Sequence, residues 1–242
     1  CGGLTPLFLE SGVKPPHSTA CPTPMSSLLT YLRPLLSQNK LHFSELQLEQ
    51  LAGHFDVLCD WNQRMSLTTI TNPEAAARLH YLDSLAAAPY LEALNTEVEV
   101  WVDVGSGGGF PGVPLSIMFH VEHFLLTDSQ HKKAQFLNEV IQNLGLESHV
   151  TVFEGRVEAG QLAALFGTEK IPRWGILARA IEKMDKQLPK LLKLPGLQVA
   201  FLWVGGDTAQ TLSQNPHRGW TVETVKLPSG DQRYLVKFRK QI

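Results

Sequence analysis

A chain of 242 residues, 43% apolar and 18% charged, has a globular composition and the length for one α/β domain with an appendage, or for two small domains. No apolar run reaches the roughly 20 residues that span a bilayer, so we expect a soluble protein without a membrane contact. Three cysteines without Cys-x-x-Cys or Cys/His ligand spacing argue for a cytoplasmic location and against a zinc site. Because the net charge is −2, any nucleic acid would have to bind at a local basic face.

The first part of the chain divides into an irregular segment and a helical segment. Residues 1–24 are rich in Pro, Gly, Ser and Thr and lack the basic start and long apolar core of a signal peptide. We interpret them as a flexible extension or a non-native N-terminus, because Met25 opens the first periodic segment. From Leu28 to Leu94, apolar residues recur at helical spacing and predict about three amphipathic helices. Residues 25–96 are therefore predicted to form an N-terminal helical cap.

From residue 97 onward, short apolar or β-branched runs alternate with helix-like stretches, which is typical of a mostly parallel sheet covered on both faces. The runs in this alternating part are Val98–Val104, Phe124–Thr127, Val150–Phe153, Gly175–Ala178 and Val199–Val204. Two later runs, Thr221–Val225 and Tyr234–Phe238, flank the turn "PSGDQ" and predict a hairpin that gives the sheet an antiparallel last strand. Residues 97–242 are predicted to be one α/β domain.

A glycine-rich stretch, "VDVGSGGGFPGVPLSI" at residues 102–117, connects the first predicted strand to a predicted helix at Val113–Phe119. Glycines let a ligand approach the backbone there, and the start of the helix supplies free N–H groups. Gly107, Gly109 and Gly112 match the pattern G-x-G-x-x-G, so a dinucleotide enzyme is one interpretation.

Two acidic residues beside this turn favour a different ligand. Asp103 stands two residues before Gly105, and its charge suits a cationic amino-acid group better than a pyrophosphate; the alternative role is a cap of the turn. Asp128 ends the next predicted strand and is placed to accept hydrogen bonds from ribose hydroxyls; its alternative role is a helix cap with Ser129. A ligand that has an amino acid at one end and a nucleoside at the other is S-adenosylmethionine.

Further motifs follow in register: "LTDSQHKKAQFLNEV", "GRVEA" and "LARA" after the glycine turn, and "WNQRMSLTTI" and "HYLDS" in the helical part. In order and spacing, these motifs resemble the bacterial small-subunit ribosomal RNA guanine methyltransferases, long called glucose-inhibited division protein B. The resemblance runs from residue 28 to residue 240. It implies a class I S-adenosylmethionine-dependent methyltransferase fold, which is a Rossmann-like, mostly parallel seven-stranded sheet with an antiparallel last strand, plus the N-terminal helical cap.

The resemblance also implies a reaction, the transfer of a methyl group to the ring N7 of one guanine in 16S ribosomal RNA. The partner would be that RNA or the small ribosomal subunit, and the protein is expected to act as a monomer without a metal ion. Because guanine N7 carries a lone pair and no proton, the reaction needs no general base. This agrees with the lack of an obvious Cys/His or Ser/His/Asp constellation in the sequence. We expect most of the histidines to lie on the surface.

Matching the family motifs assigns roles to single residues. The residues implied to bind the cofactor are Asp103, Gly105, Gly107, Phe110, Asp128, Val157, Glu158 and Arg179. Arg179 ends the fourth predicted strand and is also the expected catalytic residue, with a simple ion pair as the alternative. Val157 and Glu158 match the segment that covers the adenine, and the alternative for Glu158 is an acid in the first turn of a helix. The residues expected to be core or to tie the helical cap to the sheet are Trp61, Asn62, His80, Asp83 and Ser84.

Three positions depart from the family pattern. Ser66 replaces a usual Asn, Leu79 replaces an Arg, and Val204 replaces a Lys near the end of the fifth strand, where a lost cation would weaken contacts with RNA phosphates. A methyltransferase acting on another RNA, a small molecule or a protein is therefore one alternative, and a non-catalytic RNA-binding protein of ribosome assembly is another. A basic face beside the cofactor would favour RNA, and its candidate residues are Lys132, Lys133, Arg156, Arg179, Lys183 and Lys186.

Overall fold

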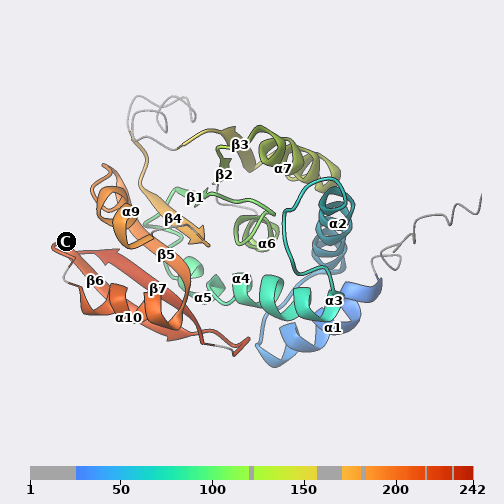
Figure 1. The fold of residues 1–242 in the computed structure, drawn as a ribbon, viewed down its shortest axis with the longest axis horizontal. Coiled ribbons are helices and arrows are strands. Elements are labelled where there is room, and N and C mark those ends of the chain that lie inside the picture. Colours follow the sequence, from blue (N-terminus) through green and yellow to red (C-terminus); the bar gives the residue numbers. More distant parts are fainter. Residues whose placement is uncertain are drawn as a thin grey trace, which may run out of the picture.

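A seven-stranded sheet in the order β3-β2-β1-β4-β5-β7-β6 forms the centre of the molecule (Figure 1). The computed structural model describes residues 26–119, 123–156, 171–180, 184–215, 217–230 and 232–241. The strands are β1 Val100–Val104, β2 His123–Asp128, β3 Val150–Glu154, β4 Trp174–Arg179, β5 Leu197–Gly205, β6 Trp220–Lys226 and β7 Arg233–Lys240. Strands β1 to β5 all run parallel to one another, and β7 is antiparallel to both β5 and β6. The predicted fold class and the late hairpin are confirmed.

Helices precede, connect and follow these strands. Those before the sheet are α1 Ser26–Gln38, α2 Glu45–Asn62, α3 Pro73–Ala76, the π-helical η1 Ala77–Leu82, α4 Asp83–Leu85 and α5 Ala88–Glu92. The later ones are α6 Gly112–Met118, α7 His131–Leu144, α9 Met184–Leu191 and α10 Gly206–Gln214. Local sequence sets some of their ends, because Ser44 and Gln47 form a capping box before α2 and Gly145 ends α7 in the left-handed conformation. None of the described helices combines the length and apolar character needed to cross a bilayer.

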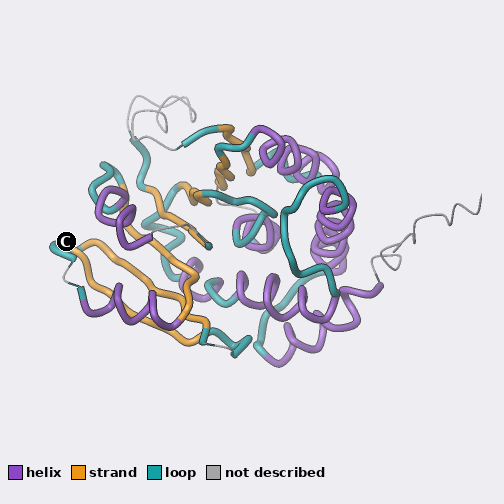
Figure 2. Tube along the Cα trace, viewed as in Figure 1, coloured by secondary structure: helices purple, strands orange, loops and turns teal. Residues whose placement is uncertain are grey.

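Helices cover both faces of the sheet, so its central strands are buried on two sides (Figure 2). Side chains alternate between the faces along each strand, and in β1 Trp101 joins one hydrophobic core while Val102 joins the other. The first core contains the N-terminal helices, α6 and α7, and the second contains α9 and α10. This two-sided burial explains the continuous apolar runs in the sequence.

The N-terminal helices share their core with one face of the sheet. Leu51 of α2 and Tyr81 of η1 are fully buried together with Trp101 of β1 and Phe201 of β5. In Figure 1, α2 lies beside α7, and the two helices are in contact. This packing fixes the loop after α2 over the carboxyl ends of the strands. The division of the chain into a helical cap at residues 25–96 and an α/β domain at residues 97–242 stays a prediction.

A buried polar link joins the N-terminal helices to the β6–β7 hairpin. Asp83 of α4 is fully buried and forms a salt bridge of 2.5 Å with Arg233 of β7. The backbone carbonyl of Asp83 accepts a hydrogen bond from Trp203 Nε1 of β5 at 2.7 Å, and Arg78 donates to the carbonyl of Ser229 at 2.8 Å. The expectation that polar residues of the "HYLDS" motif tie the helical cap to the sheet is confirmed for Asp83.

Candidate active site

The glycine turn between β1 and α6 presents bare backbone to an open space. Gly105, Gly107 and Gly109 have φ values of +70°, +54° and +88°, which glycine adopts without strain. A Cβ atom built on Gly105 would meet no described heavy atom within 4 Å, whereas one on Gly109 would lie 2.8 Å from His54 Nε2. Gly105 therefore leaves room for a ligand, and Gly109 is required by the packing of the turn.

Asp103 lies beneath this turn as a fully buried carboxylate. Its Oδ2 accepts a hydrogen bond from the backbone N–H of Gly112 at 2.9 Å, while Oδ1 has no hydrogen-bond partner among the described residues. Burial raises the pKa of Asp103 to about 7, although the bond from Gly112 lowers it. Asp103 thus joins β1 to the start of α6, which is the structural role considered as its alternative. A role in cofactor binding stays a prediction.

We expect Asp103→Asn to change how the stability of the cofactor-free protein depends on pH. The folded state binds the carboxyl proton of Asp103 more tightly than the unfolded state does, because burial raises the pKa of Asp103 to about 7 from the ordinary 3.8. The contribution of protonated Asp103 to the free energy of unfolding of the parent protein is fully present below about pH 4. It is lost as the pH rises through about 7. The free energy of unfolding of Asp103→Asn relative to the parent should therefore grow by about 2–3 kcal/mol between pH 5 and pH 8. Urea unfolding at both pH values measures this difference, and parallel pH profiles for the two proteins would contradict the expectation.

Asp128 connects the end of β2 to the glycine turn. Its Oδ2 accepts a hydrogen bond from Gly107 N at 3.1 Å, and its Oδ1 accepts one from Gln130 N at 2.9 Å. The N-cap position of α7 belongs to Gln130, so Asp128 forms a turn before the helix and does not occupy the helix cap. Each carboxylate oxygen keeps a lone pair, and the predicted contact with a ribose remains chemically open.

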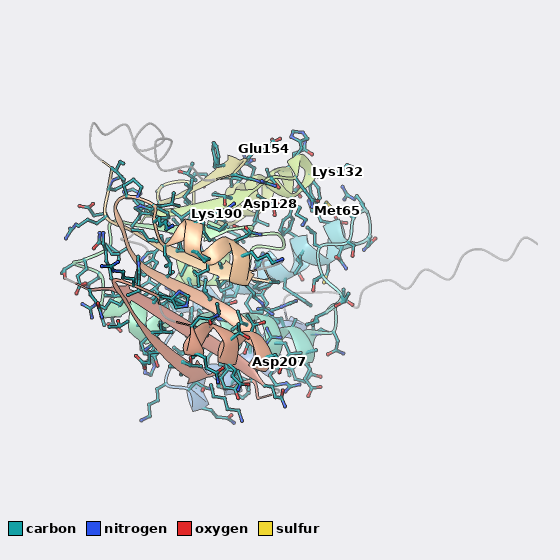
Figure 3. The ribbon with its side chains drawn as sticks, turned by 60° about the vertical axis from the view of Figure 1, so that its left-hand side comes forward. Met65, Asp128, Lys132, Glu154, Lys190 and Asp207 are labelled. Carbon is teal, nitrogen blue, oxygen red and sulfur yellow. The ribbon has the colours of Figure 1, made fainter. Side chains whose placement is uncertain are left out.

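A cavity of about 420 Å³ lies beside the ends of β1, β2 and β3. The residues of its wall that follow these strands are Gly105, Asp128, Ser129, Gly155 and Arg156. Figure 3 labels Asp128, its neighbour Glu154 at the end of β3, and Lys190 of α9, which also lines this first cavity. Val157 and Glu158, which were predicted to cover an adenine here, lie outside the described residues.

A second cavity, of about 400 Å³, lies on the other side of the same turn. Its wall includes Gly105, Gly107, Phe110, Thr68, His80 and Arg179. Residues of the loop between α2 and α3 form one side of this second cavity. Asn62 shapes this loop, because its Oδ1 accepts hydrogen bonds from the N–H groups of Leu67 and Thr68 at 2.8 Å and 2.9 Å. Gly105 lines both cavities.

Arg179 points its guanidinium at the second cavity from the end of β4. Its Nη2 donates to the carbonyl of Leu79 at 2.8 Å and lies 3.3 Å from His80 Nδ1. Its Nη1 is buried and finds no partner in the part of the chain that the structure describes. Burial lowers the pKa of Arg179 to about 10, so the group stays charged at neutral pH. No salt bridge to Arg179 is found among the described residues, which leaves its charge and its Nη1 donor for a ligand.

Two buried histidines belong to the site: His80, which was expected from the sequence to tie the helical cap to the sheet, and His54, which was missed. His54 Nε2 lies 3.0 Å from the Gly108 carbonyl, and His80 stacks on Phe110 with ring centroids 4.4 Å apart. Burial lowers the pKa of His54 to about 4 and, with Arg179 nearby, that of His80 to about 3. The expectation was that most of the histidines lie on the surface, and His54, His80 and His149 are the buried exceptions among the described residues. The position of His54 between Leu51 and Leu58 on the apolar face of α2 was the available signal.

Phe110, which was expected to bind the cofactor, packs mainly against the ring systems of the N-terminal region. Besides stacking on His80, its ring makes an edge contact with Tyr81 at 5.2 Å. Phe110 is only 7% exposed and contributes to the wall of the second cavity. In the described ranges, no group of three or more His, Cys, Asp or Glu side chains could hold a metal ion.

The positions that depart from the family pattern lie at different distances from this site. Ser66 is exposed and lines the second cavity, and Leu79 contributes the carbonyl that accepts from Arg179. Val204 is half-buried near the end of β5 and pairs with Tyr234 of β7. Among the candidate basic residues, Lys133 and Arg179 line the second cavity, Arg156 lines the first, and Lys183 lies outside the described residues.

The sheet order, the antiparallel β7 and the glycine turn between β1 and α6 define a class I methyltransferase fold. A solved structure from Klebsiella pneumoniae, described as an O-methyltransferase, matches with a TM-score of 0.56 at 13% identity, over 88% of this chain and 97% of that one. The family described as rRNA small subunit methyltransferase G, or GidB, matches residues 47–232, and this chain belongs to that family.

Relatives of known name support the family assignment over nearly their full length. The ribosomal RNA small subunit methyltransferase G of Vibrio vulnificus (strain CMCP6) is 32% identical over 222 residues, which are 89% of this chain and 99% of the relative. The protein of the same name from Shewanella frigidimarina (strain NCIMB 400) is 34% identical over 218 residues, 88% of this chain and 100% of the relative. The resemblance read from the motifs is confirmed.

Proposed function

We propose that this chain is an S-adenosylmethionine-dependent methyltransferase that modifies the ring N7 of a guanine in 16S ribosomal RNA. One observation carries the proposal: Gly105 lines both cavities, and open space lies over its backbone. A methyl donor in the first cavity and a base in the second would meet there. Membership of the rRNA small subunit methyltransferase G family supports ribosomal RNA as the class of substrate.

The first cavity and the turn fit the chemistry of S-adenosylmethionine. Gly105 leaves space for close approach, and the carboxylates of Asp103 and Asp128 favour a ligand that carries ammonium and sulfonium charges. When bound, the cofactor supplies an electrophilic methyl group. The residues that we propose for holding it are Asp103, Gly105, Gly107, Asp128 and Arg179, of which Gly107 and Arg179 reach it from the side of the second cavity. Phe110 shapes the wall of that second cavity, and Val157 and Glu158 are proposed from the sequence alone.

The second cavity suits a reaction that needs orientation of a base and no proton transfer. Guanine N7 has a free lone pair, so methylation releases no proton at this atom. The low pKa values of His54 and His80 keep both imidazoles neutral, and their hydrogen bonds hold the turn and the Arg179 side chain. The charge of Arg179 can grip a phosphate or a guanine edge, which fixes the base in place.

Basic residues at both cavities favour a polyanionic substrate. Lys133 and Arg179 line the second cavity, and Arg156 and Lys190 line the first. Such clusters attract RNA phosphates even though the whole chain has a net charge of −2. This arrangement supports RNA over a small neutral substrate.

Titration calorimetry and a methylation assay test the proposal together. We expect S-adenosylhomocysteine to bind with a dissociation constant near the micromolar range and NAD not to bind, because the carboxylates of Asp103 and Asp128 beside the turn suit a cationic amino-acid group better than a pyrophosphate. Labelled cofactor should then transfer methyl groups to isolated small ribosomal subunits or 16S RNA, with the product mapped to guanine N7. Binding of NAD without a response to S-adenosylhomocysteine would contradict the proposal. Cofactor binding without transfer to RNA would instead favour another substrate.

A further inference from the structure

A chain of hydrogen bonds runs from Arg179 through His80 to Thr68 and fixes where each proton lies. Arg179 Nη2 is 3.3 Å from His80 Nδ1, and His80 Nε2 is 2.8 Å from Thr68 Oγ1. A guanidinium can only donate, so His80 Nδ1 accepts from it. A neutral imidazole carries one N–H. The Leu79 carbonyl, the other acceptor near the His80 ring, already accepts from Arg179 Nη2 at 2.8 Å, so the contacts favour the proton on Nε2, from which it donates to Thr68 Oγ1.

These bonds leave the Thr68 hydroxyl able to act toward a ligand only as a hydrogen-bond donor. Besides the bond from His80, Thr68 Oγ1 accepts a hydrogen bond from the backbone N–H of Ile70 at 3.0 Å. A hydroxyl has two lone pairs and one proton, and both lone pairs are used. The described residues offer no acceptor to the remaining proton, and Thr68 lines the second cavity. Thr68 therefore presents a hydrogen-bond donor that cannot switch to an acceptor.

A fixed donor in this cavity discriminates between purines. Guanine shows two neighbouring acceptors, N7 and O6, along the edge that contains N7, whereas adenine shows N7 and an N6 amino donor. We infer that the Thr68 hydroxyl donates to O6 of the target guanine and makes the site specific for a 6-oxopurine. This inference rests on the proposed function and adds to it the residue that selects the base. An adenine would place its amino group against the Thr68 proton, and both groups would lose their partners.

The inference is tested with purine analogues in reconstituted small subunits that carry a single replacement at the mapped guanine. 2-Aminopurine keeps N7 and the 2-amino group of guanine and lacks O6. The parent should methylate guanine about 10-fold to 100-fold faster than 2-aminopurine under single-turnover conditions. Thr68→Val keeps the shape of the side chain and removes the hydroxyl, and with it the bonds from His80 and Ile70 as well as the donor. It should reduce this preference to within about threefold by slowing the reaction with guanine more than the reaction with 2-aminopurine. Thr68→Ser should keep the preference.

Thr71→Val serves as the matched control, because Thr71 is an exposed threonine of the same loop that does not line the cavity. It should show the parent's rates on both substrates. A Thr68→Val variant that slows both substrates by the same factor, or slows neither, would overturn the contact with O6 while leaving the methyltransferase assignment intact. A parent that transfers no methyl group to subunits with guanine would overturn the proposed function and the contact together.

The state of His80 gives a second measurement that needs no substrate. Nitrogen-15 chemical shifts of the His80 ring in the labelled protein report which nitrogen carries the proton. The inference requires the proton on Nε2. A proton on Nδ1 would make Thr68 the donor to His80 and leave no hydroxyl proton for a base, which would overturn the inference regardless of the activity.

Discussion

Arg179→Lys is expected to lower the single-turnover rate of methyl transfer at least about 100-fold while the protein stays folded. Arg179 uses Nη2 to bond with the Leu79 carbonyl and with His80, and it still has an unpartnered Nη1 in the described structure. A lysine has a single nitrogen and a shorter reach, so it cannot hold these groups and also contact a phosphate or guanine edge. Rates on the mapped guanine, with circular dichroism and thermal unfolding to confirm the fold, measure the effect.

Arg173→Lys provides the matched control at the other end of the same strand. Arg173 precedes β4, is exposed, and forms a salt bridge of 3.4 Å with Glu99. Exposed ion pairs of this kind contribute little, so the control should keep the parent's rate and stability within error. Some loss of cofactor affinity in Arg179→Lys is compatible with the proposed role. An Arg179→Lys enzyme with the parent's turnover would show that the guanidinium is not needed for the reaction.

Gly105→Val is expected to weaken cofactor binding at least about 100-fold while leaving most of the stability. A Cβ atom at this position meets no described heavy atom within 4 Å, so the main effect on the fold is expected to be the strain of φ at +70°, on the order of 1–3 kcal/mol. In the complex, the same side chain would occupy the space that a ligand needs above the turn. Calorimetric titration with S-adenosylhomocysteine gives the affinity, and urea unfolding gives the stability.

Gly219→Val is the control that distinguishes the effect of backbone strain from the effect of blocking the space over Gly105. Gly219 has φ of +82°, and a Cβ there also meets no described atom within 4 Å, but it precedes β6 and lines neither cavity. Both variants should lose similar free energy of unfolding, and Gly219→Val should bind the cofactor like the parent. Equal affinities in the two variants would mean that the open space over Gly105 is not a binding site.

The sheet could be predicted from the sequence because its signals are local. Apolar runs such as Gly175–Ala178 mark strands that are buried on both faces, and the turn "PSGDQ" between two β-branched runs marks the hairpin. The glycine turn was equally local, since glycines with an acid at the strand tip occur within one short stretch. What these patterns could not give is which glycine stays open, because that depends on the neighbours His54 and Val113.

The second cavity could not be derived from local patterns, because its wall is assembled from distant segments. Thr68 precedes the first strand of the sheet, and Arg179 ends the fourth. Among the described contacts, His80 on the π-helical turn η1 connects the two side chains. A single polar residue on an otherwise apolar helix gives no hint of its partner in one sequence. Asn62 illustrates the same limit, since its amide closes the loop by bonds to backbone atoms that any residue possesses.

The shared hydrophobic core of the N-terminal helices and the sheet restricts how this enzyme can be recombined. The segment that supplies Thr68 and His80 to the second cavity also supplies Leu51 and Tyr81 to the core that holds Trp101. A chimaera that exchanges the N-terminal segment would therefore replace one side of this packed core at the same time. Under the role proposed for Thr68, we expect substrate choice to be altered more readily by point changes in the loop after α2 than by exchanging the whole N-terminal segment.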